Sequence, residues 1–224
     1  LMRPSLPSFL FDLALVPQHD RVWIKRNVEP TLGMLSPSQD GEADPQRGIV
    51  LLGGISKHFH WSNIDVAQQV HKIVSEAPQQ QWLVIDSRRT PEALRGHLNL
   101  PANARYVHWR DTQPSWLTRQ LSLSSSTWVT PDSASMVYEA LSFAGRVGVI
   151  ELRPRWRRNK LAHGIRSLHA LGYVGLVDKG PLCEQNLNKV ALAEHKRCAK
   201  LIMQRWFSAL LEDADSVSTA GGGV

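Results

Sequence analysis

The sequence predicts an α/β fold, a Rossmann-like parallel sheet wound with helices on both faces. From residue 48 onward, short apolar runs alternate with longer stretches of helical periodicity. Such an alternation is typical of parallel strands that are joined by helices. The chain has 224 residues, 42% of them apolar, which is enough for one large domain with a true core but too few for two full domains.

Five strands are predicted along the chain, at residues 49–52, 82–85, 106–109, 127–130 and 147–152. Helices are predicted between and after them, at residues 64–77, 91–99, 115–121, 133–144, 160–171 and 189–211. In the last helix Cys198, Ile202, Trp206 and Leu210 recur every four residues. We expect this stripe to pack on the sheet domain.

The first 47 residues differ from the rest. Residues 11–17 are predicted to form one more strand, short and buried, that ends at Pro17. Residues 36–47 are polar and rich in proline and glycine, as in a linker. We therefore expect residues 1–47 to be the remnant of an N-terminal domain with its linker. Residues 48–212 would form the sheet domain with its C-terminal helices, and the serine-, alanine- and glycine-rich residues 213–224 a flexible tail.

Composition restricts the class of partner. Lysine and arginine number 26 against 20 aspartate and glutamate, so the net charge is +6 and an acidic partner is indicated: nucleic acid, a membrane surface or a nucleotide phosphate. Two cysteines, Cys183 and Cys198, exclude a disulfide scaffold. No apolar run approaches the roughly 20 residues of a membrane span, and no signal peptide is recognisable at the N-terminus. We expect a cytoplasmic protein.

Ligands of open α/β sheets bind beyond the carboxyl ends of the strands. The loop after the first strand of the sheet contains Gly53, Gly54, Ser56, Lys57 and His58. Paired glycines before a helix allow a diphosphate to approach backbone N–H groups, while the three polar side chains supply donors. The loop matches neither GxxxxGK(S/T) nor GxGxxG, and glycines that only shape a tight turn are the alternative. A metal site at His58 and His60 lacks a third ligand at a telling spacing.

The loop after the second strand contains Ser87, Arg88, Arg89 and Thr90. Thr90 before Pro91 predicts a helix N-cap, which leaves the two arginines at the edge of the sheet. Two guanidinium groups there can bind a phosphate bidentately. The alternative is a surface pair that bridges to Asp86 or Glu92.

The loop after the fourth strand leads into a helix and contains the candidate residues Asp132, Ser133, Ser135, Met136 and Glu139. Asp132 or Ser133 is expected to cap the helix. Asp132, Met136 and Glu139 share one helical face, so that Glu139 lies close enough to accept hydrogen bonds from a ribose diol. The alternative is a capped structural helix whose glutamate is solvated.

The order and spacing of these motifs resemble the ELM-type family, which is named after a plant mitochondrial fission factor and includes bacterial glycosyltransferase-like proteins. The resemblance runs to about residue 171. It rests on the segments Arg3-Pro4-Ser5-Leu6-Pro7, Phe11-Asp12-Leu13, Pro17-x-His19-Asp20, Asn27-Val28, Thr31-x-Gly33, Gly53-Gly54-x-Ser56-Lys57-His58, Ser87-Arg88-Arg89-Thr90-Pro91 and Thr130-x-Asp132-Ser133-x-Ser135-Met136-x-x-Glu139-Ala140.

The resemblance implies the donor half of a B-type (GT-B) glycosyltransferase fold, in which two Rossmann-like domains face each other and the C-terminal one binds a nucleoside diphosphate sugar. Two departures matter. Members normally begin with an N-terminal domain that carries a Gly-His-x-Asn-Gln type loop, which has no counterpart here, and an acidic residue is usual where Pro131 stands. We therefore expect a truncated protein without its acceptor domain.

In the favoured hypothesis Ser56, Lys57, Arg88 and Arg89 stabilise the leaving diphosphate without a metal or other cofactor. The general base is left open between the absent domain and His19-Asp20. The alternative is a non-catalytic interaction protein that uses the basic residues 153–160, with Trp156 among them, at a membrane surface or an acidic partner. A peripheral membrane or lipid-linked acceptor, and a peripheral position at the inner face of a membrane, are left open. Nucleic acid is disfavoured because no recognition motif accompanies the basic residues.

Overall fold

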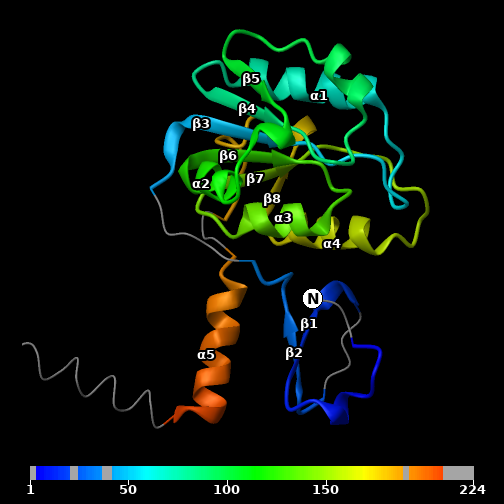
Figure 1. Cartoon of the computed structure of the whole chain (residues 1–224), viewed down its shortest axis with the longest axis vertical. Coiled ribbons are helices and arrows are strands. Elements are labelled where there is room, and N and C mark those ends of the chain that lie inside the picture. The colour runs from blue at the N-terminus through cyan, green and yellow to red at the C-terminus, as the bar shows by residue number, and fades with distance from the viewer. Residues whose placement is uncertain (1–3, 21–24, 37–41, 189–191, 209–224) are drawn as a thin grey trace, which may run out of the picture.

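The computed structural model describes residues 4–20, 25–36, 42–188 and 192–208 (Figure 1). Its larger part is a six-stranded parallel sheet, which confirms the predicted fold class. The strands are β3 (Asp44–Leu51), β4 (Gln81–Ile85), β5 (Ala104–Val107), β6 (Ser124–Val129), β7 (Arg146–Val149) and β8 (Val174–Leu176). They lie in the order β5-β4-β3-β6-β7-β8. The chain therefore reverses its direction of winding between β3 and β6, which is the position where such sheets bind ligands.

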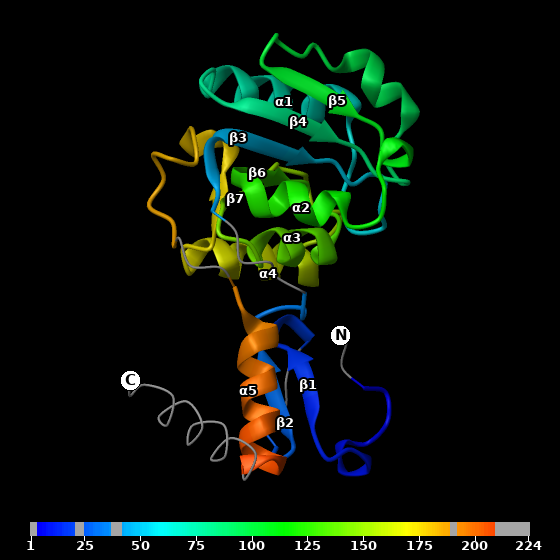
Figure 2. The same cartoon turned by 60° about the vertical axis from the view of Figure 1, so that its left-hand side comes forward.

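Helices cover both faces of the sheet (Figures 1 and 2). α1 (Asn63–Glu76) lies on one face, and α2 (Trp116–Leu123), α3 (Ala134–Leu141) and α4 (Lys160–Ala170) lie on the other. Alternate residues at the end of β3 enter the two resulting cores: Ile49 and Leu51 pack with α3, whereas Val50 and the next residue after the strand, Leu52, pack with α1. A strand buried on both faces must be apolar throughout, which explains the uninterrupted apolar run at this point.

Local side-chain caps fix two of the predicted helices. The hydroxyl of Ser62 accepts from the N–H of Asp65 at the start of α1, and the Asn159 side chain accepts from two N–H groups at the start of α4. The helix predicted at 91–99 is wrong, because only the 3-10 helix η3 (Glu92–His97) forms there. That segment contains Gly96, which lowers its propensity to extend into an α-helix. β8 was not predicted, because three residues around Gly175 are too few to show a period.

A smaller unit lies beside the sheet domain. Parallel strands β1 (Ala14–Pro17) and β2 (Val28–Thr31) form a separate two-stranded sheet. α5 (Glu194–Trp206) lies alongside them rather than over the six-stranded sheet (Figures 1 and 2). Arg197 of α5 pairs with Glu29 at 2.6 Å and donates to the Pro30 carbonyl at 2.7 Å. Cys198 of the predicted stripe is thus buried beside β2, whereas Trp206 is exposed, so the expectation that the stripe packs on the sheet domain is wrong. Leu210 and the predicted tail lie outside the described residues.

Within the described part of the chain, no helix has the length and apolar content needed to cross a bilayer.

Candidate functional site

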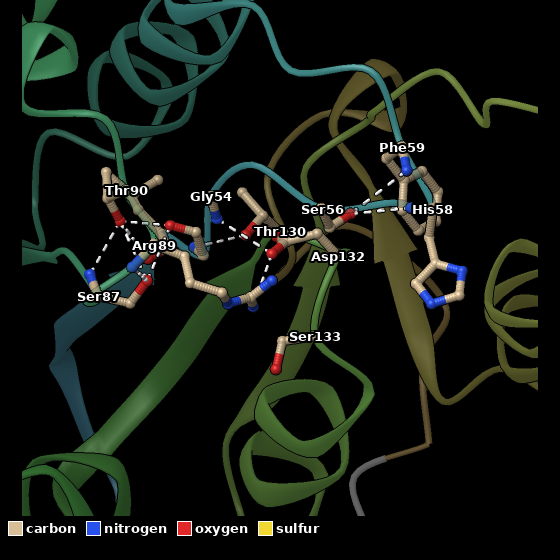
Figure 3. A network of polar contacts seen from close by, with 12 residues as sticks. Gly54, Ser56, His58, Phe59, Ser87, Arg89, Thr90, Thr130, Asp132 and Ser133 are labelled. Atoms are coloured by element: carbon tan, nitrogen blue, oxygen red, sulfur yellow. Dashed lines mark hydrogen bonds and ion pairs between the residues drawn. The ribbon is translucent and has the colours of Figure 1, made fainter.

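Three loops meet at the carboxyl edge of the sheet, as the sequence predicted from strand ends (Figure 3). They follow β3, β4 and β6. The Gly53 N–H donates to the Thr130 hydroxyl at 2.7 Å, which joins the loops after β3 and β6. The Ser87 hydroxyl donates to the Gly53 carbonyl at 2.9 Å, which joins the loops after β3 and β4. The candidate residues are therefore neighbours in space although they are far apart in sequence.

Asp132 is the centre of this cluster. Its side chain is fully buried, and its Oδ2 atom accepts from the Gly54 N–H at 3.0 Å and pairs with the Arg89 guanidinium at 2.8 Å (Figure 3). Its Oδ1 atom has no hydrogen-bond partner among the described residues. Asp132 therefore ties the three loops together and caps no helix, and the N–H groups of Gly53 and Gly54 are already satisfied within the protein.

Both glycines are needed because the loops approach each other closely. A Cβ atom at Gly53 would overlap the carboxylate of Asp132, and one at Gly54 would overlap the carbonyl of Arg89. The absent side chains thus make room for other parts of the chain. This geometry favours the interpretation that the glycines shape the loop over the one in which they admit a diphosphate.

The loop after β4 uses its hydroxyl groups internally. The Thr90 Oγ1 atom accepts from the Ser87 N–H at 2.9 Å and donates to the Leu52 and Gly53 carbonyls. The predicted N-cap at Thr90 is wrong, because Pro91 occupies that position of η3 and no side chain caps it. Thr90 instead holds the loop against the end of β3.

The two arginines of this loop differ. Arg89 is paired with Asp132, yet 42% of its side chain remains exposed. Arg88 is exposed and forms no ion pair with any described residue. Neither of them bridges to Asp86 or Glu92. Of the two arginines, Arg88 thus has no ion-pair partner among the described residues, whereas Arg89 is held in a fixed orientation by Asp132.

The helix after β6 begins without a side-chain cap. Ser133 stands at the N-cap position of α3, but no described side chain accepts from the first N–H groups of the helix. The Ser133 hydroxyl bonds that of Ser135 at 3.0 Å. The prediction that Asp132 or Ser133 caps this helix is therefore wrong, although Ser133 does stand at the N-cap position. The positive end of the helix dipole is left open at the point where the winding of the sheet reverses.

Further along α3, Met136 and Glu139 have different environments. Met136 packs against the apolar core under the helix. Glu139 is half-buried, and burial raises the pKa of its carboxyl group. No described residue forms a hydrogen bond or an ion pair with this carboxyl. A carboxylate that has left water without a protein partner is costly, and such groups are concentrated at functional sites.

The rest of the loop after β3 rests on the basic segment 153–158, a contact that the sequence did not predict. Phe59 pairs with Pro154 as an antiparallel bridge. The Arg155 N–H donates to the His58 carbonyl at 3.0 Å, and the ring of Trp156 lies 6.1 Å from that of His58. Burial and the neighbouring Lys57 lower the pKa of His58. The basic segment is therefore part of the site.

The remaining polar groups of this loop have separate roles. Ser56 accepts from the N–H groups of His58 and Phe59 through its hydroxyl, so it shapes the loop. Lys57 is exposed and has no carboxylate partner among the described residues. No group of three or more histidine, cysteine, aspartate or glutamate side chains within the described ranges is arranged to hold a metal ion, at His58 and His60 or elsewhere.

A second polar cluster at the same edge was not predicted. The carboxylate of Asp86 accepts from the Tyr106 hydroxyl at 2.6 Å, the His108 Nδ1 atom at 2.7 Å and the Trp109 N–H at 2.6 Å. Burial, followed by the hydrogen bond to Asp86, raises the pKa of Tyr106. The sequence contained one signal for this cluster, since Asp86 directly follows a predicted strand. However, the strand predicted at 106–109 was displaced by two residues: β5 covers Ala104–Val107 and leaves His108 beyond it.

The chain is similar to one protein family and to several solved structures. The model of the family described as Mitochondrial fission ELM1 matches residues 1–206. A search of curated proteins finds no significant match. Similar solved structures include MurG from Acinetobacter baumannii, with 11% identity over 86% of this chain and 53% of that chain and a TM-score of 0.47. The spinosyn forosaminyltransferase SpnP has 12% identity over 73% of this chain and 41% of that chain, with a TM-score of 0.43.

A Listeria monocytogenes protein described as a UDP-N-acetylglucosamine 2-epimerase has 15% identity over 74% of this chain and 41% of that chain, with a TM-score of 0.42. The chain thus spans about half of these proteins or less. Because all three scores are low, the fold assignment rests on the strand order of the sheet itself.

Proposed function

Because the chain belongs to the mitochondrial fission ELM1 family, we propose that it binds a nucleoside diphosphate sugar at the carboxyl edge of its six-stranded sheet, as the donor-binding half of a glycosyltransferase-like protein. One observation carries the proposal. The N-terminus of α3 is uncapped at the point where the winding of the sheet reverses. An open helix N-terminus at such a point is suited to an anionic ligand.

The diphosphate is assigned to donors that the protein leaves free. The N–H groups of Gly53 and Gly54 are occupied, so the phosphates face the first turn of α3 and the hydroxyls of Ser133 and Ser135. Lys57 and Arg88 are exposed on the loops that meet there, and Arg89 pairs with Asp132, directly before Ser133, so all three bring positive charge to this edge of the sheet. In this arrangement they stabilise the charge that develops on the leaving diphosphate.

The other candidate residues support these groups. Ser56, Ser87 and Thr90 bond within the loops, and Asp132 holds Arg89 in place. We assign them to shaping the site. The attachment of the basic segment 153–158 to the same loop adds positive charge to the donor site. This attachment favours the donor-binding hypothesis over a non-catalytic interaction protein.

Glu139 is assigned to the ribose hydroxyls. Replacement by glutamine is expected to weaken the binding of a nucleoside diphosphate 10- to 100-fold, because hydrogen bonds to a charged carboxylate are worth about 1.5–3 kcal/mol. The same change is expected to raise stability at neutral pH. Burial raises the pKa of Glu139 in the folded state, so its ionisation opposes folding increasingly as pH rises through that pKa. Calorimetric titration and urea unfolding measure the two effects.

Glu76→Gln is the matched control. Glu76 ends α1, at the opposite edge of the sheet, and its exposed carboxylate pairs only loosely with Lys72 at 3.8 Å. That variant should leave both affinity and stability within experimental error. Unchanged nucleotide affinity in Glu139→Gln would contradict the ribose assignment.

The two arginines give a second test. Arg88→Ala is expected to weaken nucleoside diphosphate binding about tenfold with no loss of stability, because Arg88 is exposed and pairs with no carboxylate in the described part of the chain. Arg89→Ala is expected to lower both affinity and stability, because it also removes the partner of the buried Asp132. Titration at two salt concentrations checks that the Arg88 effect is electrostatic. An unchanged affinity in Arg88→Ala would exclude Arg88 from the phosphate site.

We assign the acceptor to a compound at a membrane surface, such as a lipid-linked hydroxyl. The side chains of Ile55 and Trp156 are 60% and 48% exposed, and they lie on the two paired loops at the site, next to Arg157 and Arg158. Exposed apolar and basic side chains in this combination suit an anionic membrane interface. Sedimentation with vesicles tests it: the chain should bind vesicles with anionic lipid, and Trp156→Ala should bind them less.

The proposal as a whole is tested by calorimetric titration of the purified chain with a panel of nucleoside diphosphates and their sugars. Saturable binding that is lost in Glu139→Gln supports a donor site and identifies the base. Absence of binding to every member of the panel would overturn the proposed function.

A further inference from the structure

The geometry points to His108, held by Asp86, as the general base that activates the hydroxyl acceptor in the transfer reaction. This inference rests on the proposed function and supplies a group that the sequence left unassigned. Asp86 directly follows β4, and His108 directly follows the neighbouring strand β5. The pair therefore lies at the same edge of the sheet as the proposed donor site.

The hydrogen bonds of Asp86 fix which nitrogen of His108 is free. The carboxylate is buried, and three donors point to it: the Tyr106 hydroxyl, the Trp109 N–H and the His108 ring at Nδ1. A carboxylate can only accept, so Nδ1 of His108 carries a proton. In the neutral ring Nε2 then holds the lone pair. Nε2 has no hydrogen-bond partner among the described residues, and 39% of the side chain is exposed.

This is the constellation that a general base requires. A histidine whose Nδ1 donates to a buried carboxylate is held in one tautomer and one orientation, and the carboxylate stabilises the imidazolium that forms. The ring of Trp109 lies 5.8 Å from that of His108 and restrains it further. Asp86 acts through His108 and is therefore a positioning residue.

Asp86 and His108 lie on the side of the site toward which the sugar end of the proposed donor extends. Ser87, the residue after Asp86, donates to the Gly53 carbonyl at 2.9 Å, so the pair is one residue from the three-loop cluster. With the ribose at Glu139 beside β6 and the diphosphate between β6 and β3, the sugar end extends across β4 toward β5. Neighbouring strands are about 4.8 Å apart, so β5 lies about 10 Å beyond β3, and the sugar must extend this far past the diphosphate to meet His108.

The step balances with a hydroxyl acceptor and no other reagent. The acceptor oxygen forms a bond to the anomeric carbon while its proton passes to Nε2 of His108. The bond between the anomeric carbon and the diphosphate oxygen breaks, and the diphosphate leaves with the electron pair. His108 then returns the proton to water. Water itself is the acceptor when no other hydroxyl is supplied, and the products are then the free sugar and the nucleoside diphosphate.

The test compares the full chain with His108→Gln in the release of nucleoside diphosphate from the donor that calorimetry identifies, between pH 5 and 9. The wild-type rate is expected to rise with pH to a plateau, because only a neutral imidazole can take the proton of the acceptor hydroxyl. His108→Gln should lose this rise and be slower by about 10²–10⁴-fold, with donor affinity within twofold of wild type. The other charged groups around the pair, Arg95, Arg110 and Asp111, are unchanged in this variant.

Two further variants separate the roles. Asp86→Asn should reduce the rate and displace the rise with pH, because an amide no longer selects the tautomer; its fold is checked by circular dichroism. His71→Gln is the control. His71 is an exposed histidine on α1 whose Nδ1 atom also has an oxygen partner, the Asn99 carbonyl at 2.9 Å. That variant should keep the wild-type profile.

Three outcomes would contradict the assignment of His108 as the general base. If His108→Gln releases nucleoside diphosphate at the wild-type rate and with the wild-type pH profile, the inference is overturned. It is also overturned if His108→Gln binds the donor more weakly but keeps the rise of the rate with pH. Donor binding without any release of nucleoside diphosphate by the wild-type chain also overturns it, while the proposed function stands. If no donor binds, the proposed function fails first.

Discussion

Gly54→Ala is expected to lower the free energy of unfolding by about 3 kcal/mol or more, because the added methyl group has no space. Its Cβ atom would overlap the backbone carbonyl of Arg89, and backbone cannot rotate away as a long side chain can. To relieve the overlap, the loop after β3 must separate from the loop after β4. The hydrogen bonds that join them, from Ser87 to Gly53 and from Ile55 to Arg89, would then be strained or lost. Urea unfolding measures the change.

Gly96→Ala is the matched control for this substitution. Gly96 lies in η3, and a Cβ atom there meets nothing within 4 Å. The control is expected to change stability by less than about 1 kcal/mol, in the stabilising direction, because alanine restricts the unfolded chain. If Gly54→Ala were as stable as Gly96→Ala, the close approach of the two loops would be wrong. Gly54→Ala should lower both the stability and the affinity for a nucleoside diphosphate, whereas Gly96→Ala should not lower either.

The sheet and its three loops could be predicted because they depend on local pattern. Strand runs such as Ile49 to Leu52 are apolar throughout, and the start of α1 is fixed by Ser62 only three residues from its bonding partner. Since parallel strands end at one edge, the meeting of Gly53, Arg89 and Asp132 followed from the strand assignment alone.

The roles of these residues could not be predicted, because they depend on contacts between distant segments. Asp132 was expected at a helix cap or a ligand, yet its partner is a backbone N–H 78 residues away. Residues after a strand can bond across loops as readily as to a ligand, and sequence does not distinguish the two. The attachment of residues 153–158 to the loop after β3 and the pairing of His108 with Asp86 are of the same kind.

Short or irregular elements were also beyond prediction. β2 contains Pro30 and Glu29, and it is stabilised by Arg197, which lies 168 residues from Glu29 along the chain. The same ion pair explains why α5 lies beside β2. Its apolar stripe was apparent in the sequence, but periodicity specifies which face of a helix is covered and does not specify which element covers it.

Asp132→Ala is expected to be the most damaging change of a charged group, with a loss of about 2–3 kcal/mol in the free energy of unfolding. The substitution removes the acceptor of the Gly54 N–H, leaves a cavity at the junction of three loops and releases Arg89. The loss is limited because Arg89 is 42% exposed and can be hydrated once it is unpaired. Asp132→Asn should lose less, because its amide oxygen can still accept from Gly54.

A double-mutant cycle with Arg89→Ala separates the contribution of the Asp132–Arg89 ion pair from that of the hydrogen bond between Asp132 and Gly54. If Asp132 and Arg89 act through their pair, the double variant will be more stable than the sum of the single changes predicts, by about 0.5–1 kcal/mol. Additive losses would mean that Asp132 acts only through Gly54. The same variants distinguish shaping from binding: Asp132→Ala should weaken a nucleoside diphosphate no more than Arg89→Ala does, because the buried carboxylate reaches the phosphate only through the arginine that it orients.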